Sequence, residues 1–179
     1  HDEAEMIHRD VKPDNILFDS VSFECKLSDF TISRAGIKSD TRLFDCEGTA
    51  CFTAPECTVV EEGGYLPKPT DIWSLGICLY TYVAGIVPFY GDATLTLNKR
   101  QAECVNMPDD FSDDLKDLLF KLLDKDPKKR PTVVEMMSHK WFNPVFPDGE
   151  QDFEGDDRAE NVDDNFLGQP FLLNEEAGK

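Results

Sequence analysis

The stretch that decides the fold is His8-Arg9-Asp10-Val11-Lys12-Pro13-Asp14-Asn15-Ile16-Leu17-Phe18. Asp10 can accept a proton from a hydroxyl nucleophile, and the positive charge of Lys12 can hold a phosphate. Asn15 offers an amide oxygen, which is a good ligand for a hard cation such as Mg²⁺. Pro13 restricts the backbone between these groups, so they can converge at a small entropic cost. The stretch therefore predicts a site for phosphate and a divalent ion.

Two short strands are predicted next, at residues 16–18 and 25–27, with a polar turn at 19–22 between them. Such a hairpin carries Asn15 at one end and Asp29 at the other. We therefore expect the two candidate metal ligands to lie together although they are far apart in the sequence.

A long polar segment follows Phe30 and continues through Glu47, where Gly48-Thr49 begins its closing part and Thr53-Ala54-Pro55-Glu56 ends it. It has little helical or strand periodicity, which favours a functional loop. We call residues 30–56 the activation segment.

Six cysteines are present, and none forms a Cys-x-x-Cys pair, which argues against a zinc site. Isolated cysteines of this kind are typical of small buried apolar side chains. Cys46, Cys51 and Cys57 cluster in and beside the activation segment, so a redox switch is the alternative interpretation.

Four helices are predicted after this segment. Residues 71–84 are apolar almost all round and predict a buried central helix, with Thr70 as its cap and Gly85 and Pro88 at its end. Asp71 would be a buried carboxylate at the start of this helix, so it needs donors such as backbone amides. The other helices are expected at residues 94–105, 113–123 and 131–139.

The third of these helices has the clearest pattern. Ser112 is its expected cap, and its leucines form one apolar stripe, namely Leu115, Leu118, Leu119 and Leu122. Pro131 is expected to open the last helix, after which Trp141 and Phe142 pack back on the body.

The net charge of −18 and the pI of about 4.4 argue against nucleic acid or an anionic membrane as a partner. A basic protein or peptide fits this charge better, although the charge also serves solubility alone. Acidic residues dominate from Asp148 onward, which predicts a folded domain at 1–146 and a disordered acidic tail at 147–179. With no signal or membrane span in the sequence, we expect a cytoplasmic protein.

The eight residues His8 to Asn15 resemble the protein-kinase catalytic loop, with Val11 in place of the usual Leu. Ser28-Asp29-Phe30 and Thr53-Ala54-Pro55-Glu56 follow at the distances that the family shows. The resemblance covers residues 6–143 and is to the C-terminal lobe of Ser/Thr protein kinases. Within them the chain is most similar to the calcium/calmodulin-dependent kinase kinase group, through residues 48–56, 70–76 and 124–127.

This resemblance implies a mainly α fold, a kinase C-lobe in which a helical bundle bears a short β-hairpin that carries the catalytic and metal-binding loops, with the N-lobe absent. It implies transfer of the ATP γ-phosphate to Ser or Thr of a protein substrate, which could itself be a kinase. The alternatives are a truncated kinase or pseudokinase that acts as a non-catalytic binding module, and a fragment with no independent fold. Calmodulin would be a partner by family likeness, but no basic amphipathic helix follows the catalytic region.

The resemblance also implies residue roles. Asp10 would be the catalytic base and Lys12 would contact the γ-phosphate of ATP. Asn15 and Asp29 would hold Mg²⁺, and Leu17 would form the floor of the adenine pocket. One departure is Thr31, which stands where the family has Gly after Asp-Phe and could bias the loop of Asp29.

Further roles implied by the resemblance concern contacts that hold the activation segment and the catalytic loop in place. Glu56 would pair with Arg130, Asp71 would hold the catalytic-loop backbone, and His8 would stack on Phe30. Thr49 belongs to the same segment.

A phosphate in this segment often pairs with the arginine at the Arg9 position. We hypothesise that Asp45 or Glu47 mimics that phosphate. The alternative is that both carboxylates are simply solvated.

Overall fold

The computed structural model describes residues 1, 4–58, 62–89 and 105–142. The chain divides into two units, His1–Pro144 and Val145–Lys179, and all the described residues belong to the first. The helix expected at 94–105 falls outside the described residues except for Val105, and the predicted acidic tail lies outside them entirely. Among the described residues, no helix combines the length and apolar character needed to cross a membrane.

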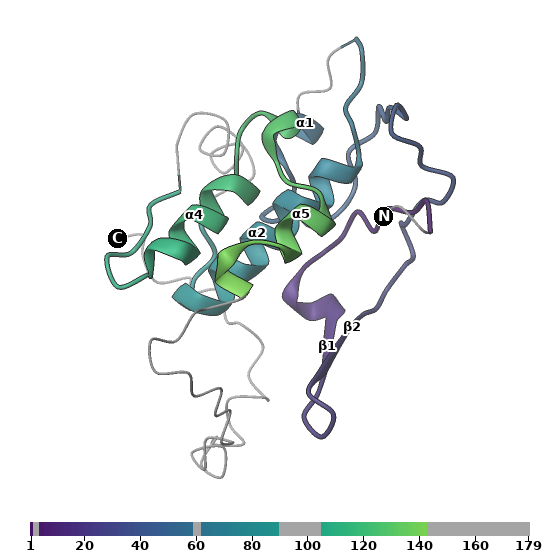
Figure 1. Cartoon of the computed structure of the whole chain (residues 1–179). Helices are drawn as coiled ribbons and strands as arrows, with labels where there is room; N and C mark the ends of the chain where they lie inside the picture. The colour runs from purple at the N-terminus through teal and green to yellow at the C-terminus, as the bar shows by residue number, and fades with distance from the viewer. Residues whose placement is uncertain (2–3, 59–61, 90–104, 143–179) are drawn as a thin grey trace, which may run out of the picture. The chain divides into compact units, whose positions relative to one another are not determined.

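The described elements are mainly helical, with one small sheet (Figure 1). In chain order they are η1 (Pro13–Asn15), β1 (Ile16–Asp19), β2 (Glu24–Leu27), α1 (Pro55–Thr58), α2 (Lys68–Ala84), α4 (Asp113–Leu122), η2 (Pro127–Lys129), α5 (Val133–Met137) and η3 (Lys140–Phe142).

The predicted hairpin is confirmed. Strands β1 and β2 pair antiparallel, with Ile16 opposite Leu27 and Asp19 opposite Glu24. The Asp19 carboxylate accepts a hydrogen bond from the Val21 amide at 2.9 Å, which stabilises the turn. At the open end, the Ser28 amide donates to the Asn15 carbonyl at 2.9 Å. The chain therefore re-enters the site directly before Asp29.

Helix α2 begins at Lys68, three residues earlier than the sequence predicted. Thr70 is not the cap, because its hydroxyl donates to the Pro67 carbonyl at 2.6 Å from inside the first turn. Proline is tolerated in a first helical turn, where the amide has no intrahelical partner, so Pro69 does not delay the helix. The predicted end is confirmed, since Gly85 is the C-cap with a φ of 70°.

The core lies where α2 packs on α4 (Figure 1). Trp73 and Ile77 of α2 are fully buried, and the predicted leucine stripe of α4 is buried as well. Ser112 caps α4 as predicted, accepting from the Leu115 amide at 3.3 Å. Gly76 permits the close approach, because a Cβ there would lie 2.9 Å from the Leu122 Cβ.

Helix α5 is shorter than the predicted helix at 131–139. Thr132, not Pro131, sets its start, because Thr132 and Glu135 form a reciprocal capping box. Trp141 packs against the core as predicted, whereas Phe142 remains 44% exposed.

The activation segment has no helix or strand before α1, as predicted. It is attached to the body by two isolated bridges, one between Ile7 and Arg34 and one between Leu43 and Tyr65. Ile37 and Leu43 are buried side chains of the segment. The segment therefore has a defined path without secondary structure.

The predicted ion pair between Glu56 and Arg130 is present and bidentate, with N–O distances of 2.6 and 2.8 Å. The Arg130 guanidinium also donates to the Pro69 carbonyl at 2.9 Å and lies 4.9 Å from the Trp73 ring centroid. Its side chain is fully buried. One guanidinium thus joins the end of the activation segment to the start of α2.

We expect Arg130→Met to lower the free energy of unfolding by about 3–5 kcal/mol, because it leaves the Glu56 carboxylate without its buried partner. Lys121→Met at the half-exposed pair with Asp117 is the matched control, and we expect it to cost less than about 1 kcal/mol. Urea unfolding measures both values. Equal losses for the two variants would contradict the anchoring role of Arg130.

Candidate functional site

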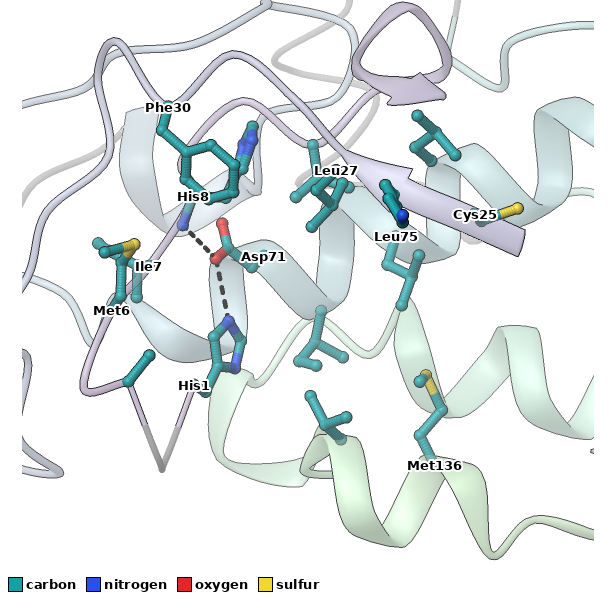
Figure 2. Close-up of a pocket in the computed structure, with 16 residues that line it drawn as sticks. His1, Met6, Ile7, His8, Cys25, Leu27, Phe30, Asp71, Leu75 and Met136 are labelled. Carbon is teal, nitrogen blue, oxygen red and sulfur yellow. Dashed lines mark hydrogen bonds and ion pairs between the residues drawn. The ribbon is translucent and has the colours of Figure 1, made fainter. Parts of the chain in front are cut away.

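Asp71 holds the start of the stretch His8–Asn15, which resembles the kinase catalytic loop and is called the catalytic loop below. One carboxylate oxygen of Asp71 accepts the His8 amide at 2.8 Å (Figure 2). The other accepts the Arg9 amide at 2.9 Å, so Asp71 has the backbone donors that the sequence predicted. The His1 ring also lies 3.0 Å from this carboxylate. Burial raises the pKa of Asp71, and the two backbone amides oppose that effect. The first turn of α2 therefore fixes where the loop passes.

Arg9 has a backbone φ of 73°, in the left-handed region that a non-glycine residue rarely adopts. Such a conformation costs on the order of 1–3 kcal/mol and persists only when its surroundings enforce it. Asp71 binds the Arg9 amide, and Gly48 lies against the Arg9 carbonyl, where a Cβ would be only 2.5 Å from that oxygen. Two separate segments thus fix the turn immediately before Asp10.

The Asp10 carboxylate is the centre of the site. Its Oδ1 accepts the Thr49 amide at 2.9 Å and the Thr49 hydroxyl at 2.7 Å. Its Oδ2 lies 2.9 Å from Lys12 Nζ and accepts a longer bond, 3.2 Å, from Asn15 Nδ2. Burial raises the pKa of Asp10, but the hydrogen bonds from Thr49 and Lys12 outweigh it, so the pKa lies below its ordinary value.

Lys12 points into the same cluster. Its ammonium donates to the Thr49 hydroxyl at 2.9 Å while it pairs with Asp10. The hydrogen bond to Asp10 raises the pKa of Lys12, and burial opposes this. Its side chain is still 23% exposed, so a fixed positive charge faces the open side of the site.

Asn15 bonds directly to Asp10, whereas the Asp29 carboxylate accepts hydrogen bonds from its neighbour Thr31. Asn15 is buried, and its Nδ2 also donates to the Asp10 carbonyl at 2.8 Å, which leaves its oxygen as the atom suited to a cation. Asp29 is exposed, with a φ of 59°. Hydrogen bonds from the Thr31 hydroxyl and amide lower the pKa of Asp29. No hydrogen bond joins the Asn15 and Asp29 side chains in the part of the chain that the structure describes.

These two residues fit a magnesium ion by the chemistry of their donors, a carboxylate oxygen and an amide oxygen. Among the described residues, no group of three or more His, Cys, Asp or Glu side chains gathers as a self-sufficient metal centre. Magnesium is commonly held by one or two carboxylates together with substrate phosphates and water. The donor set therefore fits a metal that arrives with a nucleotide.

His8 connects the hairpin to the loop. Its Nε2 lies 2.9 Å from the Ser28 carbonyl, and the Asp10 amide donates to its Nδ1 at 3.3 Å. This pattern places the ring proton on Nε2. The predicted contact with Phe30 is present, but the rings meet edge to face at 4.8 Å and are not stacked (Figure 2). Leu17, on the hairpin, is 58% exposed and available to a ligand.

A second charged cluster surrounds the Arg9 side chain. Asp45 Oδ2 lies 2.8 Å from Arg9 Nη2 and 2.7 Å from Arg34 Nη2, and Glu47 lies 3.3 Å from Arg9 Nη1. Both acidic residues therefore lie against Arg9, as the phosphate-mimic hypothesis requires, and the mimicry itself stays a prediction. The Tyr65 hydroxyl donates to the Asp45 carbonyl at 2.7 Å. The sequence did not predict that Arg34 or Tyr65 would contact Asp45. Neither residue has a spacing or motif that would have indicated this contact.

An apolar pocket of about 450 Å³ lies beside these clusters, lined by residues such as Leu27, Leu75 and Met136 (Figure 2). Its lining includes His8 and Asp71 but none of Asp10, Lys12, Asn15 and Asp29. The pocket therefore adds no polar group to the Asp10 cluster.

Comparison with known proteins gives a consistent result. The profile described as protein kinase domain matches residues 1–142. The chain is 38% identical to serine/threonine-protein kinase GRIK2 of Arabidopsis thaliana, over 76% of this chain and 34% of that protein. It is 35% identical to CBL-interacting protein kinase 31 of Oryza sativa subsp. japonica, over 93% of this chain and 40% of that protein. It is 37% identical to serine/threonine-protein kinase par-4 of Caenorhabditis elegans, over 79% of this chain and 24% of that protein. The chain thus spans less than half the length of each of these relatives.

We expect Thr49→Ala to raise the pKa of Asp10, because it removes the hydroxyl that donates to Oδ1. A depressed carboxylate pKa contributes stability that is present above the unfolded-state pKa and is lost as the pH falls through the folded-state pKa. The variant therefore retains less of this stability at neutral pH. Carboxyl-carbon NMR titration of Asp10 measures the shift. Thr49→Ser keeps the hydroxyl and should leave the pKa of Asp10 low. An unchanged pKa in Thr49→Ala would show that the Thr49 hydroxyl does not lower the pKa of Asp10.

Proposed function

Because this chain belongs to the protein kinase domain family, we propose that it forms the C-terminal lobe of a Ser/Thr protein kinase. The reaction is transfer of the ATP γ-phosphate to a Ser or Thr hydroxyl of a protein substrate. The observation that carries the proposal is the convergence of Lys12, Asn15 and Thr49 on the Asp10 carboxylate, within hydrogen-bond distance.

Asp10 is the residue that orients the substrate hydroxyl and accepts its proton. Thr49 occupies Oδ1 with two short hydrogen bonds, whereas the Asn15 bond to Oδ2 is the longest of the four contacts. Oδ2 is therefore the atom at which a substrate hydroxyl can replace a protein donor. The low pKa of Asp10 makes it a weak base. Phosphoryl transfer tolerates this, because its catalysis consists mainly of positioning and charge stabilisation.

The remaining residues would hold the nucleotide and the metal. Lys12 would contact the γ-phosphate from the exposed side of the cluster, and Leu17 would lie against the adenine. The oxygens of Asn15 and Asp29 would bind Mg²⁺, which neutralises phosphate charge when bound. These assignments rest on donor chemistry and on the family likeness.

The substrate is proposed to be a basic protein segment, because the chain carries a net charge of −18. The finer likeness to the calcium/calmodulin-dependent kinase kinase group supports a second kinase as that substrate.

A second candidate function is a non-catalytic binding module. The observation that favours it is the pair of hydrogen bonds from Thr31 to Asp29 Oδ1, which compete with a metal for one of the two carboxylate oxygens. The two candidates differ in whether Mg·ATP binding leads to phosphate transfer.

Asp10→Asn tests the enzyme assignment in the longest natural product that contains this chain. We expect transfer of phosphate from Mg·ATP to a basic Ser/Thr peptide to fall by about 10²–10⁴-fold, the usual contribution of a positioned base. Asp14→Asn removes the same charge from a neighbouring exposed residue and should retain activity. Equal activity of the two variants would refute the role of Asp10, and binding of Mg·ATP without transfer by the unmodified protein would favour the binding module.

Thr31→Gly tests the competition for Asp29. Removing the hydroxyl takes away one of the two donors to Asp29 Oδ1 and leaves the backbone amide as the other, so the Kd for Mg·ATP should fall, by less than about tenfold because a single side-chain hydrogen bond is removed. Thr31→Ser retains the donor and serves as the control. Isothermal titration of the same natural product with Mg·ATP measures the change. A weaker affinity in Thr31→Gly would show that Thr31 supports the site.

A further inference from the structure

The Asp45 carboxylate joins two arginines that come from different segments. Its Oδ2 is 2.8 Å from the guanidinium of Arg9 in the catalytic loop and 2.7 Å from that of Arg34 in the activation segment. Its own backbone carbonyl accepts the Tyr65 hydroxyl at 2.7 Å. Asp45 is therefore held through both its side chain and its backbone.

The burial of Arg9 makes this contact energetically important. The Arg9 side chain is only 4% exposed, so its charge has little access to water and depends on protein acceptors. Arg34, by contrast, is 44% exposed and can be solvated without Asp45. Burial lowers the pKa of Arg9, but the hydrogen bond and charge of Asp45 outweigh this and raise it overall. Asp45 thus supplies the buried guanidinium with its nearest counter-charge.

The charges in this cluster balance without any modification. Asp45 and Glu47 contribute two negative charges, and Arg9 and Arg34 contribute two positive charges. A phosphorylated hydroxyl carries about −1.5 to −2 at neutral pH, so the two carboxylates together match the charge of one phosphate. A phosphate added beside them would leave the cluster with excess negative charge.

The cluster is mechanically connected to Asp10. The Arg9 backbone is strained and its carbonyl lies against Gly48, the residue before Thr49. Thr49 in turn binds Asp10 Oδ1 through its amide and its hydroxyl. Pairing of Asp45 with Arg9 therefore holds the activation segment in the path that delivers Thr49 to Asp10.

We propose that Asp45 is a built-in positioning residue that orders the activation segment permanently, as a phosphate–arginine pair does in segments that are ordered by phosphorylation. The inference rests on the proposed kinase function and adds a mode of regulation to it. Because Asp45 and Glu47 already supply the negative charge beside Arg9, no phosphorylation of residues 30–56 is required for activity.

The first test is independent of catalysis. Amide hydrogen exchange is measured over residues 43–53 in the unmodified protein and in Asp45→Asn, Asp45→Glu and Asp40→Asn. We expect faster exchange only in Asp45→Asn, because Asp45→Glu keeps the charge and Asp40 is an exposed carboxylate of the same segment. Identical exchange in Asp45→Asn and Asp40→Asn would overturn the proposal.

The second test measures activity in the natural full-length protein after phosphatase treatment, with intact mass confirming that no phosphate remains. We expect the treated protein to stay active and Asp45→Asn to lose about 10- to 100-fold in kcat, because the catalytic groups are displaced, with little change in KM for ATP. Asp45→Glu should restore most of the loss. If Asp45→Asn does not fold, Arg34→Gln removes the second contact at an exposed position and should lower kcat by a smaller factor.

The outcomes separate the two proposals. Loss of activity on phosphatase treatment, or equal kcat in Asp45→Asn and Asp40→Asn, overturns the role of Asp45 while the kinase function stands. Absence of phosphate transfer before treatment overturns the kinase function, and the inference with it.

Discussion

The two hydrogen bonds from the backbone of His8 and Arg9 to the Asp71 carboxylate are the constraint on which the site depends. Asp71 lies in the first turn of α2, and the same helix supplies Trp73 and Ile77 to the buried core, so the position of Asp71 is tied to that core. Burial raises the pKa of the Asp71 carboxyl, and a buried carboxylate is costly unless hydrogen-bond donors satisfy it. The catalytic-loop amides are those donors. The core therefore gains a satisfied polar group and the loop gains a fixed path from the same contact.

Arg9 shows how one residue can join three parts of the molecule. Its amide binds α2 through Asp71, its carbonyl lies against Gly48, and its side chain pairs with Asp45. The strained backbone at Arg9 persists because Asp71 binds its amide and Gly48 lies against its carbonyl, so the turn is held on both sides. Because Asp10 is the next residue, we expect the loss of any of these contacts to shift the Asp10 carboxylate. This arrangement explains how a segment without secondary structure can control the geometry of a site in a different segment.

The sequence predicted the features that depend on local pattern or on a single strong physical demand. The hairpin, the leucine stripe of α4 and the need of Asp71 for amide donors were all predicted and are present. Helix α2 starts three residues before the predicted position, because Thr70 is a good cap in isolation whereas a first helical turn tolerates Pro69. Arg34 could not have been predicted as a partner of Asp45. That contact depends on the path of an irregular loop, which periodicity does not encode.

Asp10 and Asp29 illustrate how similar carboxylates acquire different chemistry. Both have a pKa below the ordinary value, but Asp10 owes this to donors from Thr49 and Lys12 in a half-enclosed cluster, and Asp29 owes it to its neighbour Thr31 at an exposed position. Lys12 is close to Asp10 in the sequence, but the two Thr49 donors come from a distant segment and reach Asp10 only when the activation segment is in place. The donors of Asp29 are two residues away and form whenever that turn forms. Asp10 therefore reports the state of the whole fold, whereas Asp29 depends on a local turn. The proposed metal-binding role of Asp29 and the proposed catalytic role of Asp10 can for this reason be lost separately.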